Sequence, residues 1–148
     1  MEPKRPYLGP TEGKHVMMRG GNVFVKTGAD GAFGRFAMGT QQVLTGVGIP
    51  IHRHFEMDET FYVAEGSGTF IMDAVRYAIE KGGSIFIPRH SWHGFENPDC
   101  ELLLLWIMAP PGVEQFFPEI GTPPGVQAVQ RTKDEVDQIT RNYGTEFR

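Results

Sequence analysis

Residues 46–66 read GVGIPIHRHFEMDETFYVAEG, and this stretch decides the fold. His52 and His54 are separated by one residue in a segment of β character. Side chains of a β-strand alternate between its two faces, so both imidazoles project to the same side. Two imidazoles on one face form the beginning of a metal site.

Three acidic residues follow the histidines closely, namely Glu56, Asp58 and Glu59. Glu56 shares the face of the histidines if the strand simply continues. Residues 55–58, however, lack strand alternation and indicate a turn, and a chain reversal there brings Glu59 back beside the histidines. Further along, His93 follows a strand end marked by a proline, which makes it available to complete the set.

The spacing of these residues continues into two longer patterns. The first is Gly46, five residues, His52, one residue, His54, four residues, Glu59, six residues, Gly66. The second is Gly82, five residues, Pro88, four residues, His93, three residues, Asn97. Together they resemble the two motifs of the cupin superfamily, at 46–66 and 82–97. One position departs from the second motif, because His90 stands where the family has glycine.

The resemblance implies a small single-domain metal-binding cupin, similar to the quercetin dioxygenase-like members. It implies a jelly-roll barrel whose open mouth holds one divalent transition metal ion, with the ligands His52, His54, Glu59 and His93. The chemistry of these residues agrees, since imidazole and carboxylate suit Fe, Mn, Ni, Cu, Co or Zn. Four protein ligands leave positions of a six-coordinate metal open for water, dioxygen or substrate.

The rest of the chain reads as all-β, because 19 Gly and 11 Pro are spread along it as turns between short strands. The expected strands are Asn22–Thr27, Gly34–Met38, Gln42–Val47, Thr60–Glu65, Gly68–Asp73, Val75–Glu80, Ser84–Ile87, Gly94–Glu96 and Glu101–Met108. Hairpin turns are expected at Glu65–Gly68 and Lys81–Gly83, because glycine reaches the positive φ of tight turns.

One or two short helices are expected after the barrel. Residues 132–135 have the Thr-x-x-Glu form of a capping box, and Val136, Ile139 and Tyr143 recur at helical spacing before Gly144. A further turn of helix is expected within residues 113–120. We therefore expect one domain, with an N-terminal arm at 1–20 and a jelly-roll barrel at 21–148.

Composition excludes several classes of protein. The chain has 148 residues and a formal charge of −4, which leaves no excess of basic residues for a nucleic-acid surface. The longest apolar run, residues 102–109, is far shorter than the ~20 residues of a membrane span. One cysteine permits no internal disulfide. We expect a cytoplasmic protein that binds a small molecule, with no nucleic-acid or membrane partner.

The candidates for the substrate pocket are chosen by residue type and by their position near the motifs. Its candidates are large or polar residues near the motifs: Phe61, Met72, His90, Trp92 and Trp106. Arg35, Arg53, Arg76 and Arg89 are candidates for binding a carboxylate, although strand parity turns Arg53 away from the histidines. An apolar pocket favours an uncharged aromatic or enolic substrate.

The leading hypothesis is a metal-dependent dioxygenase, with Glu59 as the acid–base residue. The alternatives are a non-redox metal-dependent isomerase or lyase, and a small-molecule binding or sensor cupin without catalysis, because fold does not fix the reaction. A homodimer with exchanged N-terminal strands is also expected, since residues 22–25 form a strand edge that a partner would cover.

Overall fold

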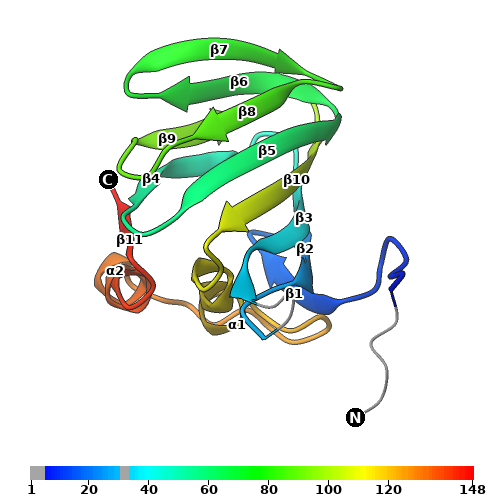
Figure 1. The fold of residues 1–148 in the computed structure, drawn as a ribbon, viewed down its shortest axis with the longest axis vertical. Helices are drawn as coiled ribbons and strands as arrows, with labels where there is room; N and C mark the ends of the chain where they lie inside the picture. The colour runs from blue at the N-terminus through cyan, green and yellow to red at the C-terminus, as the bar shows by residue number, and fades with distance from the viewer. Residues whose placement is uncertain (1–5, 31–33) are drawn as a thin grey trace.

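A computed structural model describes residues 6–30 and 34–148. It confirms an all-β chain with short helices, whose strands form two sheets (Figure 1). The six-stranded sheet has the order β1 (Lys14–Met18), β2 (Gly21–Thr27), β3 (Ala37–Val43), β10 (Leu102–Ala109), β5 (Asp58–Glu65) and β8 (Ser84–Ile87). The five-stranded sheet has the order β11 (Thr145–Phe147), β4 (Ile49–His54), β9 (His93–Glu96), β6 (Ser67–Met72) and β7 (Val75–Glu80).

The core lies between the sheets and follows strand alternation. In β10 every second residue is buried, from Leu102 to Met108, and Glu59, Phe61 and Val63 are the buried residues of β5. Their neighbours in the strands point to the outer face of the six-stranded sheet, where Tyr62 is exposed. The five-stranded sheet contributes three buried histidines, on β4 and β9.

Two expected hairpins are wrong. The turn at Glu65–Gly68 joins β5 to β6, and the turn at Lys81–Gly83 joins β7 to β8, so each connects strands of different sheets. Gly66 has φ 91° and Gly82 has φ 90°, a backbone conformation that favours glycine. The two glycines therefore serve turns from one sheet to the other and not hairpin turns. A turn sequence indicates a reversal and does not state which strand the chain pairs with next.

The expected break between Gly34–Met38 and Gln42–Val47 is also wrong, because β3 runs unbroken through Gly39. A Cβ atom at Gly39 would lie 2.3 Å from a ring atom of Trp106. The glycine therefore makes room for the indole on the neighbouring strand and does not end the strand.

The N-terminal segment contributes a strand of its own. Within the expected arm, β1 pairs antiparallel with β2 of the same chain. β2 therefore has a neighbouring strand on each side, β1 and β3. In the described residues it is not an edge strand, so the reason given for a dimer with exchanged N-terminal strands is wrong. Residues 1–5 of the arm lie outside the described residues.

The helices follow the sequence signals. Val113–Gln115 forms a 3₁₀ turn (η2) that leads into α1 (Phe116–Ile120), and α2 spans Lys133–Arg141. At the start of α2 the Thr132 hydroxyl accepts a hydrogen bond from the backbone N–H of Glu135, and the Glu135 carboxylate accepts one from the N–H of Thr132. No helix in the described part of the chain is long and apolar enough to cross a membrane.

Candidate metal centre

Three buried histidines from two adjacent strands lie close together. β4 carries His52 and His54 on one face, and β9 begins with His93, which lies opposite His52 in the strand register. Their candidate ligand atoms all lie within 4.8 Å of one another. All three side chains are buried. The short spacing in β4 and the register with β9 together produce the cluster.

The Nδ1 atoms of His52 and His93 point away from the cluster. His52 Nδ1 lies 2.8 Å from the carbonyl oxygen of Pro50, and His93 Nδ1 lies 2.9 Å from that of Ser91. A carbonyl oxygen only accepts hydrogen bonds, so each Nδ1 carries the proton and donates. The Nε2 atom of each ring is then left with a free lone pair, which is the form that binds a metal.

Glu59 completes the cluster from the opposite sheet. It is the second residue of β5, and its Oε2 lies 3.4 Å from His54 Nε2 and 3.6 Å from His93 Nε2. Glu56, in contrast, is exposed in the turn, and Asp58 accepts hydrogen bonds from the backbone and guanidinium of Arg89. Of the three acids, the structure brings only Glu59 to the histidines.

The electrostatics of the cluster favour a cation. Burial, together with the charges of His93 and His54, lowers the pKa of His52 well below its usual value of 6.5, so His52 is neutral at physiological pH. Burial acts to raise the pKa of Glu59, but the neighbouring imidazoles of His54 and His93 outweigh it and lower that pKa to about 2. The carboxylate is therefore ionised, and its negative charge attracts a cation to the cluster.

Two buried polar atoms of the cluster lack hydrogen-bond partners. Among the described residues, the buried side-chain nitrogen and oxygen atoms without a hydrogen bond are Glu59 Oε2, His93 Nε2 and Trp106 Nε1. Leaving such an atom unpaired costs about 1–3 kcal/mol. A divalent metal bound by the imidazoles and the carboxylate would satisfy the first two at once, so these residues fit the expected ion.

The predicted substrate-pocket residues divide into an inner and an outer group. Phe61 packs edge-on against Phe95 at 5.1 Å, and Trp106 is fully buried and stacks on Phe117. Met72 is half-buried and lies opposite His93 in the register of β6 and β9. Of these inner residues, Met72 is the one placed directly beside a candidate ligand.

The side chains of His90 and Trp92 contact other groups than the clustered imidazoles. His90 is exposed and packs against the Phe55 ring at 5.7 Å, and its backbone adopts φ 74°. The chain thus keeps the glycine-like conformation at this position in spite of the imidazole. The guanidinium groups of Arg53 and Arg148 lie over the Trp92 ring, with their Cζ atoms 4.4 and 5.4 Å from its centroid. Trp92 therefore contacts these cations.

Two residues of β11 belong to the centre and were missed from the sequence. β11 pairs with β4, so that Thr145 lies opposite His54 and Phe147 opposite His52. The Phe147 ring stacks on that of His52, with centroids 5.0 Å apart, and the Thr145 hydroxyl lies 2.8 Å from His54 Nδ1. A strand of three residues after a helix gives no periodic signal in the sequence.

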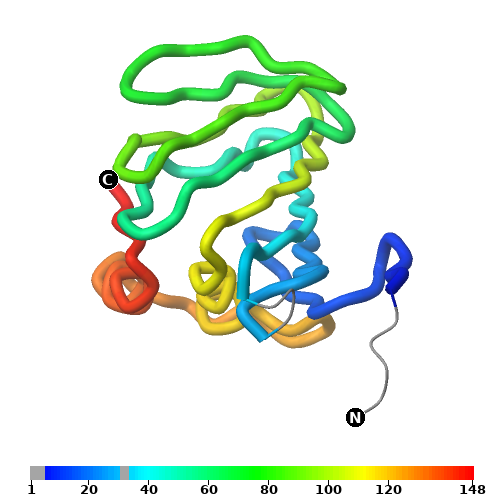
Figure 2. Tube along the Cα trace, viewed as in Figure 1, coloured from blue at the N-terminus to red at the C-terminus, as the bar shows by residue number. Residues whose placement is uncertain are grey.

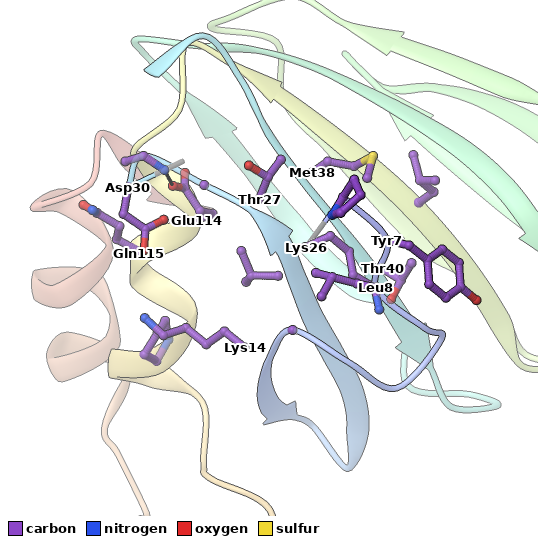
Figure 3. A pocket seen from close by; sticks show the side chains of 17 residues that line it. Tyr7, Leu8, Lys14, Lys26, Thr27, Asp30, Met38, Thr40, Glu114 and Gln115 are labelled. Carbon is purple, nitrogen blue, oxygen red and sulfur yellow. Dashed lines mark hydrogen bonds between the residues drawn. The ribbon is translucent and has the colours of Figure 1, made fainter. Parts of the chain in front are cut away.

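A separate hollow of about 830 Å³ lies beside β2 and β3, and none of the clustered imidazoles lines it (Figure 3). Two of its charged groups, Lys26 and Glu114, already have partners. Lys26 Nζ donates to the carbonyl oxygens of Gly9, Pro10 and Glu12, at 2.7, 3.0 and 2.6 Å. The Glu114 carboxylate accepts hydrogen bonds from two backbone N–H groups. These contacts hold loops together, so the histidine cluster is the stronger candidate site.

Comparison with known proteins agrees with this geometry. Residues 39–108, which carry all four clustered side chains, match the family model of the cupin domain. This segment, slightly under half of the chain, is similar to a cupin domain. An uncharacterised protein of Methanocaldococcus jannaschii is 34% identical to the chain over 47 residues. That match spans 32% of this chain and 38% of the length of the curated relative.

Several solved structures share the fold of this chain. An RmlC-like cupin from Shewanella frigidimarina aligns with a TM-score of 0.63 at 20% identity, over 74% of this chain and 95% of that one. A predicted oxalate decarboxylase from Thermotoga maritima aligns with a TM-score of 0.59 at 19% identity, over 66% and 90% of the two chains. A sugar phosphate isomerase of the cupin superfamily from Silicibacter pomeroyi aligns with a TM-score of 0.54 at 22% identity, over 62% and 60%.

Proposed function

We propose that this cupin is a metal-dependent enzyme, and specifically a dioxygenase that acts on a small aromatic or enolic compound. The observation that carries the proposal is the convergence of three imidazoles and the unpartnered Glu59 carboxylate in one buried cluster. His52, His54, His93 and Glu59 would hold one divalent transition metal. When bound, such an ion acts as a Lewis acid that lowers the pKa of a substrate hydroxyl.

The protein's own residues prepare the site for this chemistry. His52 and His93 are held by backbone carbonyls, so their Nε2 atoms stay aimed at the centre without reorganisation. Glu59 is the proton acceptor in our proposal: when its carboxylate shifts off the metal, it takes the proton of the substrate hydroxyl. Burial strengthens it as a base whenever its contact with the imidazoles loosens.

The surroundings favour an uncharged substrate. Phe70 lies beside His93, with ring centroids 6.5 Å apart, and Met72 adds a second apolar side chain there. The arginines considered for a carboxylate do not face the cluster: Arg53 pairs with Glu146, Arg76 with Glu96 and Arg89 with Asp58, and Arg35 is exposed. A strongly anionic substrate would thus lack a partner among these cations.

Metal content tests the first part of the proposal. The wild type, purified without chelator or immobilised nickel, is compared with His54→Ala and Glu59→Ala by elemental analysis. We expect one ion per chain in the wild type and loss of the ion in both variants. His15→Ala is the matched control, because His15 lies outside the cluster, stacked on Phe24. Absence of metal from the wild type after reconstitution would contradict the proposal.

Oxygen consumption tests the second part. The metal-loaded protein is screened with flavonoid-like and enolic compounds in an oxygen electrode, with Glu59→Ala as the inactive comparison. Substrate-dependent uptake supports a dioxygenase. Turnover without uptake would instead identify an isomerase or lyase, and saturable binding without turnover would identify a binding protein.

A further inference from the structure

The strand β11 is the part of the fold that the cupin motifs do not account for. It forms the edge of the five-stranded sheet beside β4, and Figure 2 shows the red end of the chain reaching that strand. Its first residue, Thr145, lies opposite His54 and has 0% of its surface exposed. A hydroxyl buried next to a clustered imidazole has no water as an alternative partner.

The direction of the hydrogen bonds follows from the neighbours of this hydroxyl. Thr145 Oγ1 lies 3.4 Å from the carbonyl oxygen of Tyr143, which only accepts, so the hydroxyl donates there. The same oxygen lies 2.8 Å from His54 Nδ1 and therefore accepts from the Nδ1–H group. His54 is then left with a free lone pair on Nε2, the atom that faces Glu59.

All three imidazoles thus donate a hydrogen bond from Nδ1, but to two kinds of acceptor. His52 and His93 each use the carbonyl oxygen two residues earlier in the chain. His54 uses a side chain 91 residues away. We infer that Thr145 is a positioning residue of the metal centre, which fixes the His54 ring as the Nδ1–H tautomer with Nε2 directed at the ligand set.

This inference rests on the proposed metal site, but its first test does not need metal. The tautomer of His54 is read from the ¹⁵N shifts of the imidazole in metal-free protein at about pH 8, where histidine is neutral. We expect the Nδ1–H form in the wild type. In Thr145→Val, which keeps the shape but lacks the hydroxyl, we expect the Nε2–H form to appear. Thr145→Ser is expected to restore the wild-type shifts.

Thr140→Val is the matched control. Thr140 is equally buried, but its hydroxyl donates to the carbonyl of Val136 inside α2. The same change of hydroxyl to methyl is therefore made outside the centre, and the His54 tautomer is expected to stay as in the wild type.

The second readout is metal affinity, measured by competition with a chelator for Co²⁺ or Zn²⁺. Loss of the hydrogen bond behind a ligand histidine lowers metal affinity about 10- to 100-fold. We expect that loss in Thr145→Val and recovery in Thr145→Ser.

The outcomes separate the two proposals. The role of Thr145 would be overturned if His54 is the Nε2–H tautomer in the wild type, or if the ¹⁵N shifts are unchanged in Thr145→Val. The measurement on the wild type tests the role even if the valine variant does not fold. A wild type that shows the expected tautomer but binds no metal would overturn the proposed metal enzyme alone.

Discussion

At the scale of single residues, His90 keeps a backbone conformation made for glycine. Its φ of 74° places it in the left-handed region, where an L side chain costs roughly 1–2 kcal/mol. Its backbone N–H donates to the carbonyl oxygen of His54 at 2.7 Å, so the turn is fixed by the strand that carries the histidines. The imidazole itself packs edge-on against the Phe55 ring.

We therefore predict that His90→Gly stabilises the protein. The free energy of unfolding, measured by urea denaturation, is expected to rise by about 1 kcal/mol, because glycine adopts this φ without strain. His90→Ala is the control, since it removes the imidazole but keeps Cβ, and it is expected to give no gain. A lower stability of the glycine variant would show that the imidazole contact outweighs the strain.

A second prediction at this scale concerns His52 in the metal-free protein. Its pKa is lowered by burial in the folded state, whereas in the unfolded chain it stays near 6.5. The unfolded state therefore binds more protons below that pH, and stability falls as the pH is lowered through it, by at most about 1.4 kcal/mol per pH unit. The slope of the free energy of unfolding against pH is measured by urea denaturation between about pH 8 and pH 5, at steps of roughly one unit.

The comparison is His52→Gln, which does not titrate in this range. Its slope below pH 6.5 is expected to be smaller than that of the wild type. Equal slopes in both proteins would mean that other groups carry the acid sensitivity.

At the scale of elements, Asn97 joins two connections of the barrel. The side chain is buried, and its Nδ2 donates to the carbonyl oxygens of Val43, Leu44 and Cys100, while Oδ1 accepts from the N–H of Gly48. One amide therefore ties the turn between β3 and β4 to the turn between β9 and β10. This explains in physical terms why an asparagine ends the second motif.

We predict that Asn97→Ala lowers the free energy of unfolding by about 2–4 kcal/mol, because it leaves several buried backbone groups unpaired. Differential scanning calorimetry measures the loss. Asn142→Ala, at the exposed end of α2, is the control and is expected to change little. A loss below ~1 kcal/mol in Asn97→Ala would indicate that water replaces the amide.

The sequence predicted elements well where a pattern was local. Val75–Glu80 and Ser84–Ile87 have the expected bounds, and the capping box of Thr132 forms as expected. The pairing of the strands was not predictable in the same way. Two glycine turns that were expected to close hairpins lead the chain into the other sheet. The clustered histidines were predictable from spacing, whereas β11 was not, since its three residues matter only through their pairing with β4.

At the scale of the whole molecule, the outer face of the six-stranded sheet exposes large apolar side chains. Tyr62 is 47% exposed and Phe86 is 63% exposed, on the neighbouring strands β5 and β8. Exposed aromatic residues on one sheet face are typical of a contact with another protein surface. The homodimer stays a prediction, now with this face as its candidate contact.

We predict a mass in solution of twice 16.5 kDa by size-exclusion chromatography with light scattering. Phe86→Glu places a charge on the outer face without touching the core and is expected to give the monomer. Val75→Glu, on the exposed strand β7 of the other sheet, is the control and is expected to keep the dimer. A wild-type mass of 16.5 kDa would contradict the prediction.

The bond between His54 and Thr145 also has a consequence for how the protein folds. It joins residues 91 positions apart, and contacts between such distant parts of a chain close late, because the entropy of the intervening loop opposes them. We expect the barrel strands to assemble before the His54 ring is fixed. At the proposed metal site, full affinity would then be acquired at the end of folding, and a bound ion would stabilise the finished barrel.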